Sequence, residues 1–274
     1  MSPVELTIHL RRCGVEGSAA RVGMSLAQSL RAHVVGLHTI TVSPATFTSP
    51  EAVSLQVQES DDLYQDALAQ APWWMQQLAA HGLTGEWKVT QGDAVEALCH
   101  ASRSSDFLVI ERPQLKPDAP TGWGLASRTV FGASAPVVVV PDTTTQASCG
   151  QRVVIAWNGS REATLAIRGA LPVLAQAAQV HVLEGEQIVS PFGVRHWPPF
   201  DLRALLQRHD VTACFAEFRP ERDRGAAILD QARAFDADLI VMGAWGQSRI
   251  TEWVLGGATR HLLQHSDIPL LVAH

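Results

Sequence analysis

The stretch "ADLIVMGAW" at residues 237–245 has a counterpart in "SDFLVIERP" at residues 105–113. Both place an Asp before a short apolar run, and such a run indicates a strand buried on both faces. A second pair of similar segments follows, "SAPVVVVPD" at 134–142 and "DIPLLVAH" at 267–274. Similarity that recurs at one distance along the chain indicates two copies of one structural unit.

Strands and helices alternate through the second copy. Short apolar runs predict strands at residues 152–157, 179–185, 211–218, 238–243 and 268–273. Apolar residues at helical spacing predict helices at 160–177, with Ser160 as N-cap, and at 200–210, 225–237 and 249–266. The first copy repeats the order, with residues 64–82 as its second helix. This alternation is typical of parallel βαβ units.

We therefore predict two tandem doubly wound α/β domains, each a five-stranded parallel sheet flanked by helices. The first spans residues 1–142 and the second residues 151–274, and the polar segment 142–151 joins them. A chain of 274 residues is long enough for two such domains, each with its own core.

The composition argues against several classes of partner. The net charge is −6 and no basic run occurs, so we expect no nucleic-acid binding. No apolar stretch approaches about 18 residues, and the first residues lack the apolar core of a signal peptide. The sequence has four cysteines that lie far apart, at Cys13, Cys99, Cys149 and Cys214. This spacing predicts reduced thiols. We expect a cytoplasmic protein without a membrane partner.

Glycines cluster where the fourth strand of the second copy ends, in "GAWGQSRITEWVLGGAT" at 243–259. In doubly wound sheets ligands bind beyond the carboxyl ends of the strands, where the strand order reverses. That rule points to this segment and to "NGS" at 158–160. Backbone N–H groups of glycines can approach a phosphate closely, but glycine also suits a tight turn or close helix–strand packing. The spacing alone leaves both interpretations open.

Several nucleotide motifs are absent from this segment. No Lys follows the glycines, which excludes the P-loop, and the first strand of the second copy is not followed by G-x-G-x-x-G. The chain also lacks the G-x-S-x-G turn of serine hydrolases. The two histidines with i,i+4 spacing, His261 and His265, have no Glu between them in an H-E-x-x-H arrangement, so we predict no metal site.

The pattern G-x2-G-x9-G at 243–256 resembles the universal stress protein family, together with "VVIAWNGSREATLAIRGALPVL" at 153–174 and "IPLLVAH" at 268–274. Members of this family fold as five parallel strands flanked by helices and pair through the last strand, and some bind ATP. The resemblance implies a tandem member whose halves form an intramolecular pseudo-dimer, and it leaves a homodimer of chains open.

The resemblance also implies an ATP site in the second domain. Gly257 stands where ATP-binding members have Ser or Thr, and Asn158 stands where the family usually has Asp. A lost hydrogen bond to a charged phosphate costs roughly 1.5–3 kcal/mol, or about 10–150-fold in affinity. The predicted site residues are Asn158, Gly159, Met242, Gly243, Gly246, Arg249, Gly256, Gly257, Ala258 and Thr259.

The first copy departs further from the pattern. Glu111 replaces the first glycine, and a carboxylate at that point repels phosphate. Pro113 and Pro117 remove N–H donors from the following segment. We predict that the first domain binds no nucleotide and serves as a structural or pairing partner.

Two functions stay open at this point. The first is a stress-response binding protein with an adenine nucleotide, ATP, in its second domain, and with Mg²⁺ only as a companion of ATP. No residue is evidently placed as a general base, so we expect no catalytic residue and at most slow ATP hydrolysis. The second is a nucleotide-free protein-interaction or scaffold module whose partners the sequence does not identify. A carrier or enzyme for a small apolar ligand has no specific support.

Overall fold

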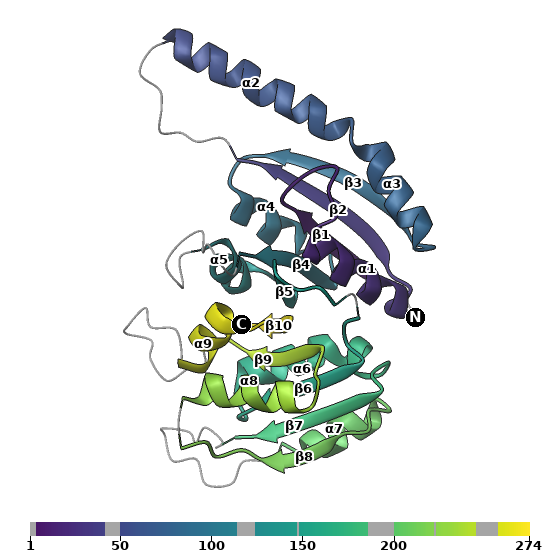
Figure 1. Ribbon diagram of the computed structural model, residues 1–274, viewed down its shortest axis with the longest axis vertical. Coiled ribbons are helices and arrows are strands. Elements are labelled where there is room, and N and C mark those ends of the chain that lie inside the picture. Colours follow the sequence, from purple (N-terminus) through teal and green to yellow (C-terminus); the bar gives the residue numbers. More distant parts are fainter. Residues whose placement is uncertain are drawn as a thin grey trace.

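The computed structural model describes residues 4–41, 50–113, 124–146, 148–185, 200–221, 223–244 and 257–274 (Figure 1). Ten strands form one sheet in the order β3-β2-β1-β4-β5-β10-β9-β6-β7-β8. The first half contributes β1 (Glu5–Leu10), β2 (His33–Ile40), β3 (Thr84–Gln91), β4 (Phe107–Arg112) and β5 (Val137–Pro141). The second half contributes β6 (Arg152–Trp157), β7 (Gln179–Glu184), β8 (Cys214–Glu217), β9 (Leu239–Gly243) and β10 (Leu270–Ala273).

The two halves have the same topology. Counted along the chain, the third, second, first, fourth and fifth strands of each half are neighbours in that order, and all of them pair in parallel. The last strands, β5 and β10, pair antiparallel, with Leu271 opposite Val138. The predicted pair of doubly wound sheets, joined as a pseudo-dimer, is therefore confirmed. The domain boundaries at residues 142 and 151 stay a prediction.

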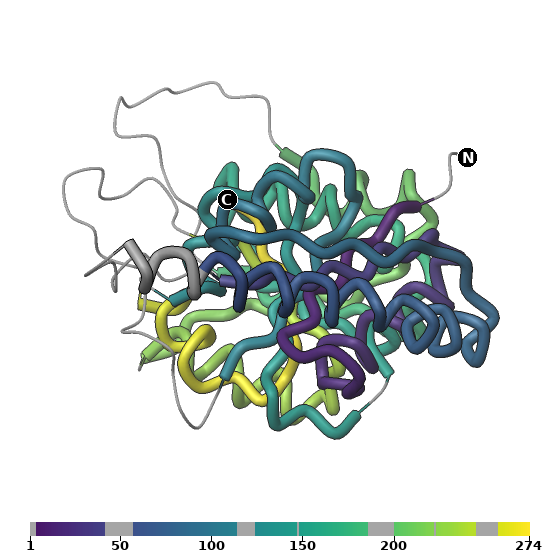
Figure 2. Tube along the Cα trace, turned by 90° about the horizontal axis from the view of Figure 1, so that it is seen from above, coloured from purple at the N-terminus to yellow at the C-terminus, as the bar shows by residue number. Residues whose placement is uncertain are grey.

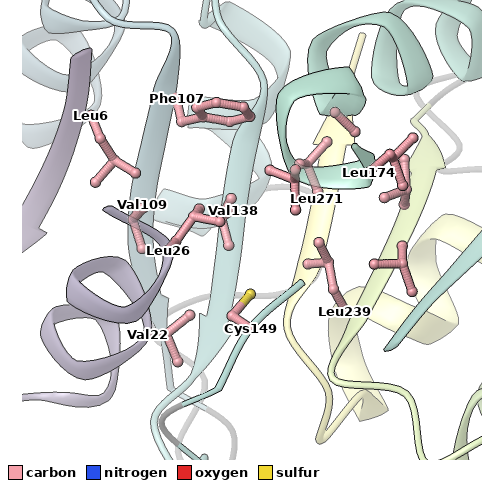
Figure 3. Close-up of a cluster of buried hydrophobic side chains, with 14 of the residues drawn as sticks. Leu6, Val22, Leu26, Phe107, Val109, Val138, Cys149, Leu174, Leu239 and Leu271 are labelled. Atoms are coloured by element: carbon pink, nitrogen blue, oxygen red, sulfur yellow. The ribbon is translucent and has the colours of Figure 1, made fainter. Parts of the chain in front are cut away.

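Helices cover both faces of the sheet. On one face α1 (Ser18–Leu30), α3 (Ala71–Ala80), α6 (Arg161–Leu174) and α7 (Leu202–Arg208) bury their apolar residues. On the other face α4 (Ala94–Ala101), α5 (Leu125–Gly132), α8 (Arg224–Ala234) and α9 (Gly257–His265) do the same. Each of the two hydrophobic clusters contains residues of both halves. Figure 3 shows Val138 and Leu271 on the facing strands of one cluster.

The Asp that precedes β4 and the Asp that precedes β9 make the same kind of contact, because each carboxylate accepts hydrogen bonds from backbone amides. Asp106 Oδ2 accepts a hydrogen bond from the amide of Glu5, at 2.8 Å. Asp238 is buried and accepts three, from the amides of Gly150, Gln151 and Arg152, at 2.9–3.0 Å. Both carboxylates thus satisfy backbone donors where the first strand of the half begins, which explains why the sequence repeats them.

The predicted helix at 64–82 is wrong in one respect, because two helices share this range. The helix α2 (Pro50–Leu68) ends and α3 begins at Ala71, with Pro72 in its first turn. Proline has no N–H and is favoured in the first turn of a helix, where that group has no partner, so Pro72 is typical of the start of a new helix. α2 lies at the end of the molecule that is far from the second half (Figure 1), and Figure 2 shows it leading into α3.

Trp73 and Trp74 belong to the packing of this region. The indole N–H of Trp74 donates to the carbonyl of Glu86, and that of Trp87 donates to the carbonyl of Ala67, both at 2.8 Å. A Cβ at Gly36 would lie 2.5 Å from the Trp74 ring, so the glycine makes room for it. Trp74 is completely buried and is therefore a packing residue.

We expect Leu271→Ala to lower the free energy of unfolding by about 2–5 kcal/mol, as for other fully buried leucines. Because the cluster around Leu271 spans both halves, the variant should still unfold in one transition. Urea denaturation followed by circular dichroism and tryptophan fluorescence measures both quantities. The control is Leu165→Ala on the exposed side of α6, with a change of about 0.5 kcal/mol or less. Two separate transitions in the Leu271 variant would contradict a shared core.

Candidate functional site

Several of the predicted site residues that the structure describes lie at the carboxyl edge of the second half's sheet. β6 and β9 are parallel neighbours, and Ala156 pairs with Met242 near their ends. Asn158 therefore follows one strand where Gly243 ends the next. This is the place where the strand order reverses, and the sequence analysis chose it for that reason.

The "NGS" loop after β6 forms a turn and a helix cap. Asn158 Oδ1 accepts a hydrogen bond from the Ser160 amide at 3.1 Å, and Gly159 has a φ of +73°, which favours glycine. Ser160 Oγ accepts from the Ala163 amide at 3.1 Å, so the predicted N-cap is confirmed. The side-chain oxygen of Asn158 is thus engaged in the turn, and its amide NH₂ is the group left to meet a ligand.

Gly243 is a glycine because β9 ends directly against α6. A Cβ at this position would collide with the Ala163 amide nitrogen and lie 2.5 Å from the carbonyl carbon of Glu162. The close-packing interpretation therefore accounts for Gly243 without a ligand. Met242, the residue before it, has its side chain buried in the core beneath α8 and α9 and contributes only backbone to this edge.

The remaining described site residues form the first turn of α9, on the opposite face of the sheet from α6. Gly257 is exposed, and a Cβ built there would meet no atom of the described residues within 4 Å. Packing therefore does not require a glycine at this position. Ala258 is half-buried and its carbonyl oxygen packs against Gly225 of α8, while Thr259 is buried. Gly246, Arg249 and Gly256 lie outside the described residues, as does Trp245.

The structure thus gathers the predicted residues into two groups. Asn158, Gly159 and Gly243 meet at the first turn of α6, and residues 257–259 make the first turn of α9. Both helix amino ends carry backbone N–H groups that have no partner within the helix, and both favour negative charge.

Sequence reasoning missed Glu162, in the first turn of α6. Its side chain is 4% exposed and its Oε2 has no hydrogen-bond partner, while Oε1 lies 3.7 Å from an Arg161 guanidinium nitrogen. The positive end of the helix favours a carboxylate in the first turn, and the sequence "SRE" after a strand could have suggested it. Its burial beside the end of β9 depends on tertiary packing, and the sequence does not show that.

The first half fills the equivalent place with its own carboxylate. The amide of Leu108 donates to the carbonyl of Pro136 as Ile240 does to Pro269, so Glu111 corresponds to Gly243. Glu111 Oε2 accepts hydrogen bonds from the Ser18 amide at 3.1 Å and from the Ser18 hydroxyl at 2.9 Å. Gly17, the N-cap residue of α1, makes no side-chain cap. Glu111 therefore caps α1 from the neighbouring strand.

A buried histidine lies beside this edge of the first half. His9 Nε2 is 3.0 Å from the Thr39 hydroxyl, and its Nδ1 has no partner. His38 is bonded through Nδ1 to the carbonyl of Leu10 at 2.6 Å and stacks on Trp87. Burial lowers the pKa of His9 from 6.5 to about 4, and the neighbouring charges of His38 and Arg11 contribute in the same direction.

The ranges that the structure describes contain no group of three or more His, Cys, Asp or Glu side chains able to hold a metal ion. The rings of His261 and His265 are 4.7 Å apart, and His261 Nδ1 lies 3.3 Å from Asp223. In the same ranges no helix has the length and apolar character that crossing a membrane demands.

A cavity of about 340 Å³ lies elsewhere, between α7 and β8. Its lining is mixed: Leu206 and Val211 are apolar, whereas Arg203 and Asp210 are charged. The Arg203 guanidinium lies 3.7 Å from the centre of the Phe215 ring, which is also part of the lining. A lining with both signs of charge does not favour the small apolar ligand considered from the sequence.

Comparisons with known proteins bear on both halves. The model of the universal stress protein family matches residues 201–274. A universal stress protein from Archaeoglobus fulgidus DSM 4304 is 16% identical, with a TM-score of 0.72, and the similarity covers 100% of this chain and 99% of that one. A functionally unknown protein from Pseudomonas aeruginosa PAO1 is 14% identical, with a TM-score of 0.61 and coverage of 99% and 92%. At such identities the likeness shows the fold.

A shorter relative aligns with about half of the chain. A universal stress protein family protein from Arabidopsis thaliana, solved with AMP bound, is 15% identical with a TM-score of 0.33, and the similarity covers 52% of this chain and 93% of that one. No ligand is carried over from this alignment. No curated protein sequence matches the chain.

We expect Glu111→Ala to lower the free energy of unfolding by about 0.5–2 kcal/mol, the usual cost of a lost N-cap. Glu111→Gln keeps one acceptor oxygen and should lose less. Urea denaturation at neutral pH measures both, with Glu16→Ala in the exposed loop before α1 as the control. Equal stabilities for Glu111→Ala and the control would show that the carboxylate does not cap α1.

From the lowered pKa of His9 we predict that the free energy of unfolding depends on pH. Because its pKa is lower in the folded chain, folding favours the neutral ring; this stabilisation is complete above pH 6.5 and is lost as the pH falls towards 4. The full shift corresponds to about 3 kcal/mol. His9→Asn should remove that part of the loss, measured by urea denaturation at several pH values between these limits. His100→Asn, at an exposed site, should keep the wild-type dependence. Parallel curves for His9→Asn and the wild type would contradict the assignment.

Proposed function

The resemblance to the universal stress protein family is confirmed by the match over residues 201–274, and from this premise we propose a stress-response binding protein that holds an adenine nucleotide in its second half. The phosphates would face the amino end of α9, with Asn158 and the end of β9 on the other side of the edge. Gly246, Arg249 and Gly256 are part of the proposal through their place in the glycine pattern.

The observation that carries the proposal is the exposure of Gly257 at the first residue of α9. Gly257 is exposed, and no atom of the described residues lies within 4 Å of the place where a Cβ would be, which supports access of an anion to the backbone N–H groups of this turn. Gly243 adds no such argument, because its packing against α6 already explains it. The proposed phosphate contact therefore lies with residues 257–259 rather than with the first glycine.

The structure of the first half supports the proposal that each chain has one nucleotide site, in the second half. The oxygen of Glu111 already accepts the donors at the amino end of α1, and its negative charge disfavours phosphate there. We propose that this half binds no nucleotide. Any Mg²⁺ would enter with the phosphates, since no ligand cluster is present among the described residues. Hydrolysis, if ATP is bound, would be slow.

The proposal also includes a cellular compartment, the cytoplasm, and a set of partners. The four cysteines are free thiols, as expected in the reducing cytoplasm. A homodimer of chains and the absence of nucleic-acid partners also remain part of the proposal, the latter on the net charge of −6.

A nucleotide-free interaction module is the second candidate, and α2 is the observation that favours it. This helix of 19 residues lies at the far end of the first half, and Val57 and Leu63 on it are more than half exposed. Apolar side chains in such a place suit contact with another protein. The two candidates differ in whether the second half binds a nucleotide at all.

Substitution of Gly257 separates them. The open space admits a side chain, so Gly257→Ser would restore the hydroxyl that ATP-binding relatives have at this position. We expect it to tighten ATP binding by about 10–150-fold over the wild type, the equivalent of one hydrogen bond to a charged group. Calorimetric titration of the purified chain measures this affinity.

Gly257→Ala is the matched control, because it adds the Cβ without the hydroxyl. It should bind ATP as the wild type does or somewhat less tightly. If neither the wild type nor Gly257→Ser releases heat at roughly millimolar ATP, an affinity of about −4 kcal/mol, the nucleotide site is refuted. The interaction module would then be the better account.

A further inference from the structure

Arg112 is a buried cation that joins the two halves. It ends β4 in the first half and is 7% exposed. Its Nη1 donates to the carbonyl of Gln264 at 3.1 Å and its Nη2 to the carbonyl of Ser266 at 2.6 Å. Gln264 belongs to the last turn of α9 and Ser266 follows that helix. The guanidinium of the first half thus covers the carboxyl end of a helix of the second half.

The carboxyl end of α9 favours the positive charge of Arg112, but burial of that charge is unfavourable. The last carbonyls of a helix have no partner within it and carry partial negative charge, so they favour a cation. Burial lowers the pKa of Arg112, the nearby charge of Asp142 opposes that effect, and Nε has no hydrogen-bond partner. A guanidinium buried in this way is tolerated because its other donors meet fixed acceptors, and it therefore specifies where α9 ends.

A second contact from the first half reaches the end of β9. The ring of Phe131, on α5, stacks on the ring of His274 with centroids 4.7 Å apart. His274 Nδ1 is 3.2 Å from the carbonyl of Ala244, the residue that follows β9. The amide of Ala244 in turn donates to the carbonyl of Ala273 at 2.9 Å. Phe131 thus acts on the strand end through His274.

The side-chain donor at the position of Arg112 is present in the first half and is missing from the equivalent position of the second half. Since Glu111 corresponds to Gly243, Arg112 corresponds to Ala244 in the second half, and alanine can donate nothing to α5. The half whose own edge is filled by Glu111 therefore supports the half whose edge is open. The end of β9 lies at the edge at which the nucleotide site is proposed, and Arg112 holds α9 at the opposite, carboxyl end of that helix.

We propose that the first half is a positioning partner for this site, with Arg112 and Phe131 as positioning residues that fix α9 and the end of β9. The inference rests on the proposed nucleotide function for its purpose, but the positioning itself can be measured without a ligand. It gives the first half a role in binding although it holds no nucleotide of its own.

Hydrogen exchange of the full chain without ligand tests the positioning. Arg112→Met keeps the length of the side chain and removes its donors, and it should speed exchange of the amides in 257–266 by about tenfold, with little change in β1 or β6. Arg112→Lys keeps the charge and should restore part of the protection. Phe131 is 63% exposed, so Phe131→Ala should fold and should affect the amide of Ala244.

Arg21→Met is the matched control. Arg21 also lies in the first half and donates through Nη2 to a backbone carbonyl, that of Thr144, at 2.8 Å, but it does not contact α9. Its substitution should leave exchange in 257–266 unchanged. Unchanged exchange of α9 in Arg112→Met would overturn the proposal, and so would a uniform increase along the chain, because that would mark a general loss of stability.

ATP titration of the same variants tests whether positioning serves the site. Arg112→Met and Phe131→Ala should weaken binding by roughly 2- to 30-fold, and Arg21→Met should not. Faster exchange of α9 with unchanged affinity would overturn the link to the site. If the wild type binds no ATP, the proposed function fails, and the exchange experiment alone decides whether the first half positions α9.

Discussion

The antiparallel pairing of β5 with β10 is the contact on which the rest of the structure depends. It turns two five-stranded sheets into one, removes an exposed apolar edge from each and lets both hydrophobic clusters run across the junction. It also sets the end of β4 beside α9, and α5 beside the last residue of the chain. Without this pairing, Arg112 could not reach the carbonyls of Gln264 and Ser266.

The two halves use one structural position in opposite ways. In the first half Glu111 extends from the end of β4 and caps α1 of the same half, which has no side-chain cap of its own. In the second half Gly243 lets the strand touch α6, and Ser160 provides the cap. The amino end of α1 is thus occupied by a carboxylate of its own half, whereas Gly257 at the start of α9 is exposed.

The sequence predicts the fold because its signals are local and repeated. Apolar runs, the two Asp residues before them and Ser160 before α6 each carry their meaning within a few residues. Pro72 is an equally local signal, and it could have predicted that the range 64–82 holds two helices rather than one. The task of Gly243 could not be predicted, since packing and phosphate binding both require the absence of a Cβ. Arg112 and Glu162 were missed because their partners and their burial arise only when distant segments meet.

We propose a division of labour in which the second half binds the nucleotide and the first half positions α9 and the end of β9. The stoichiometry of ATP binding tests it most directly, measured on the purified full-length chain at protein concentrations well above the dissociation constant. We expect one nucleotide per chain. Two per chain would contradict the closure of the first half by Glu111, and none would contradict the site at the amino end of α9.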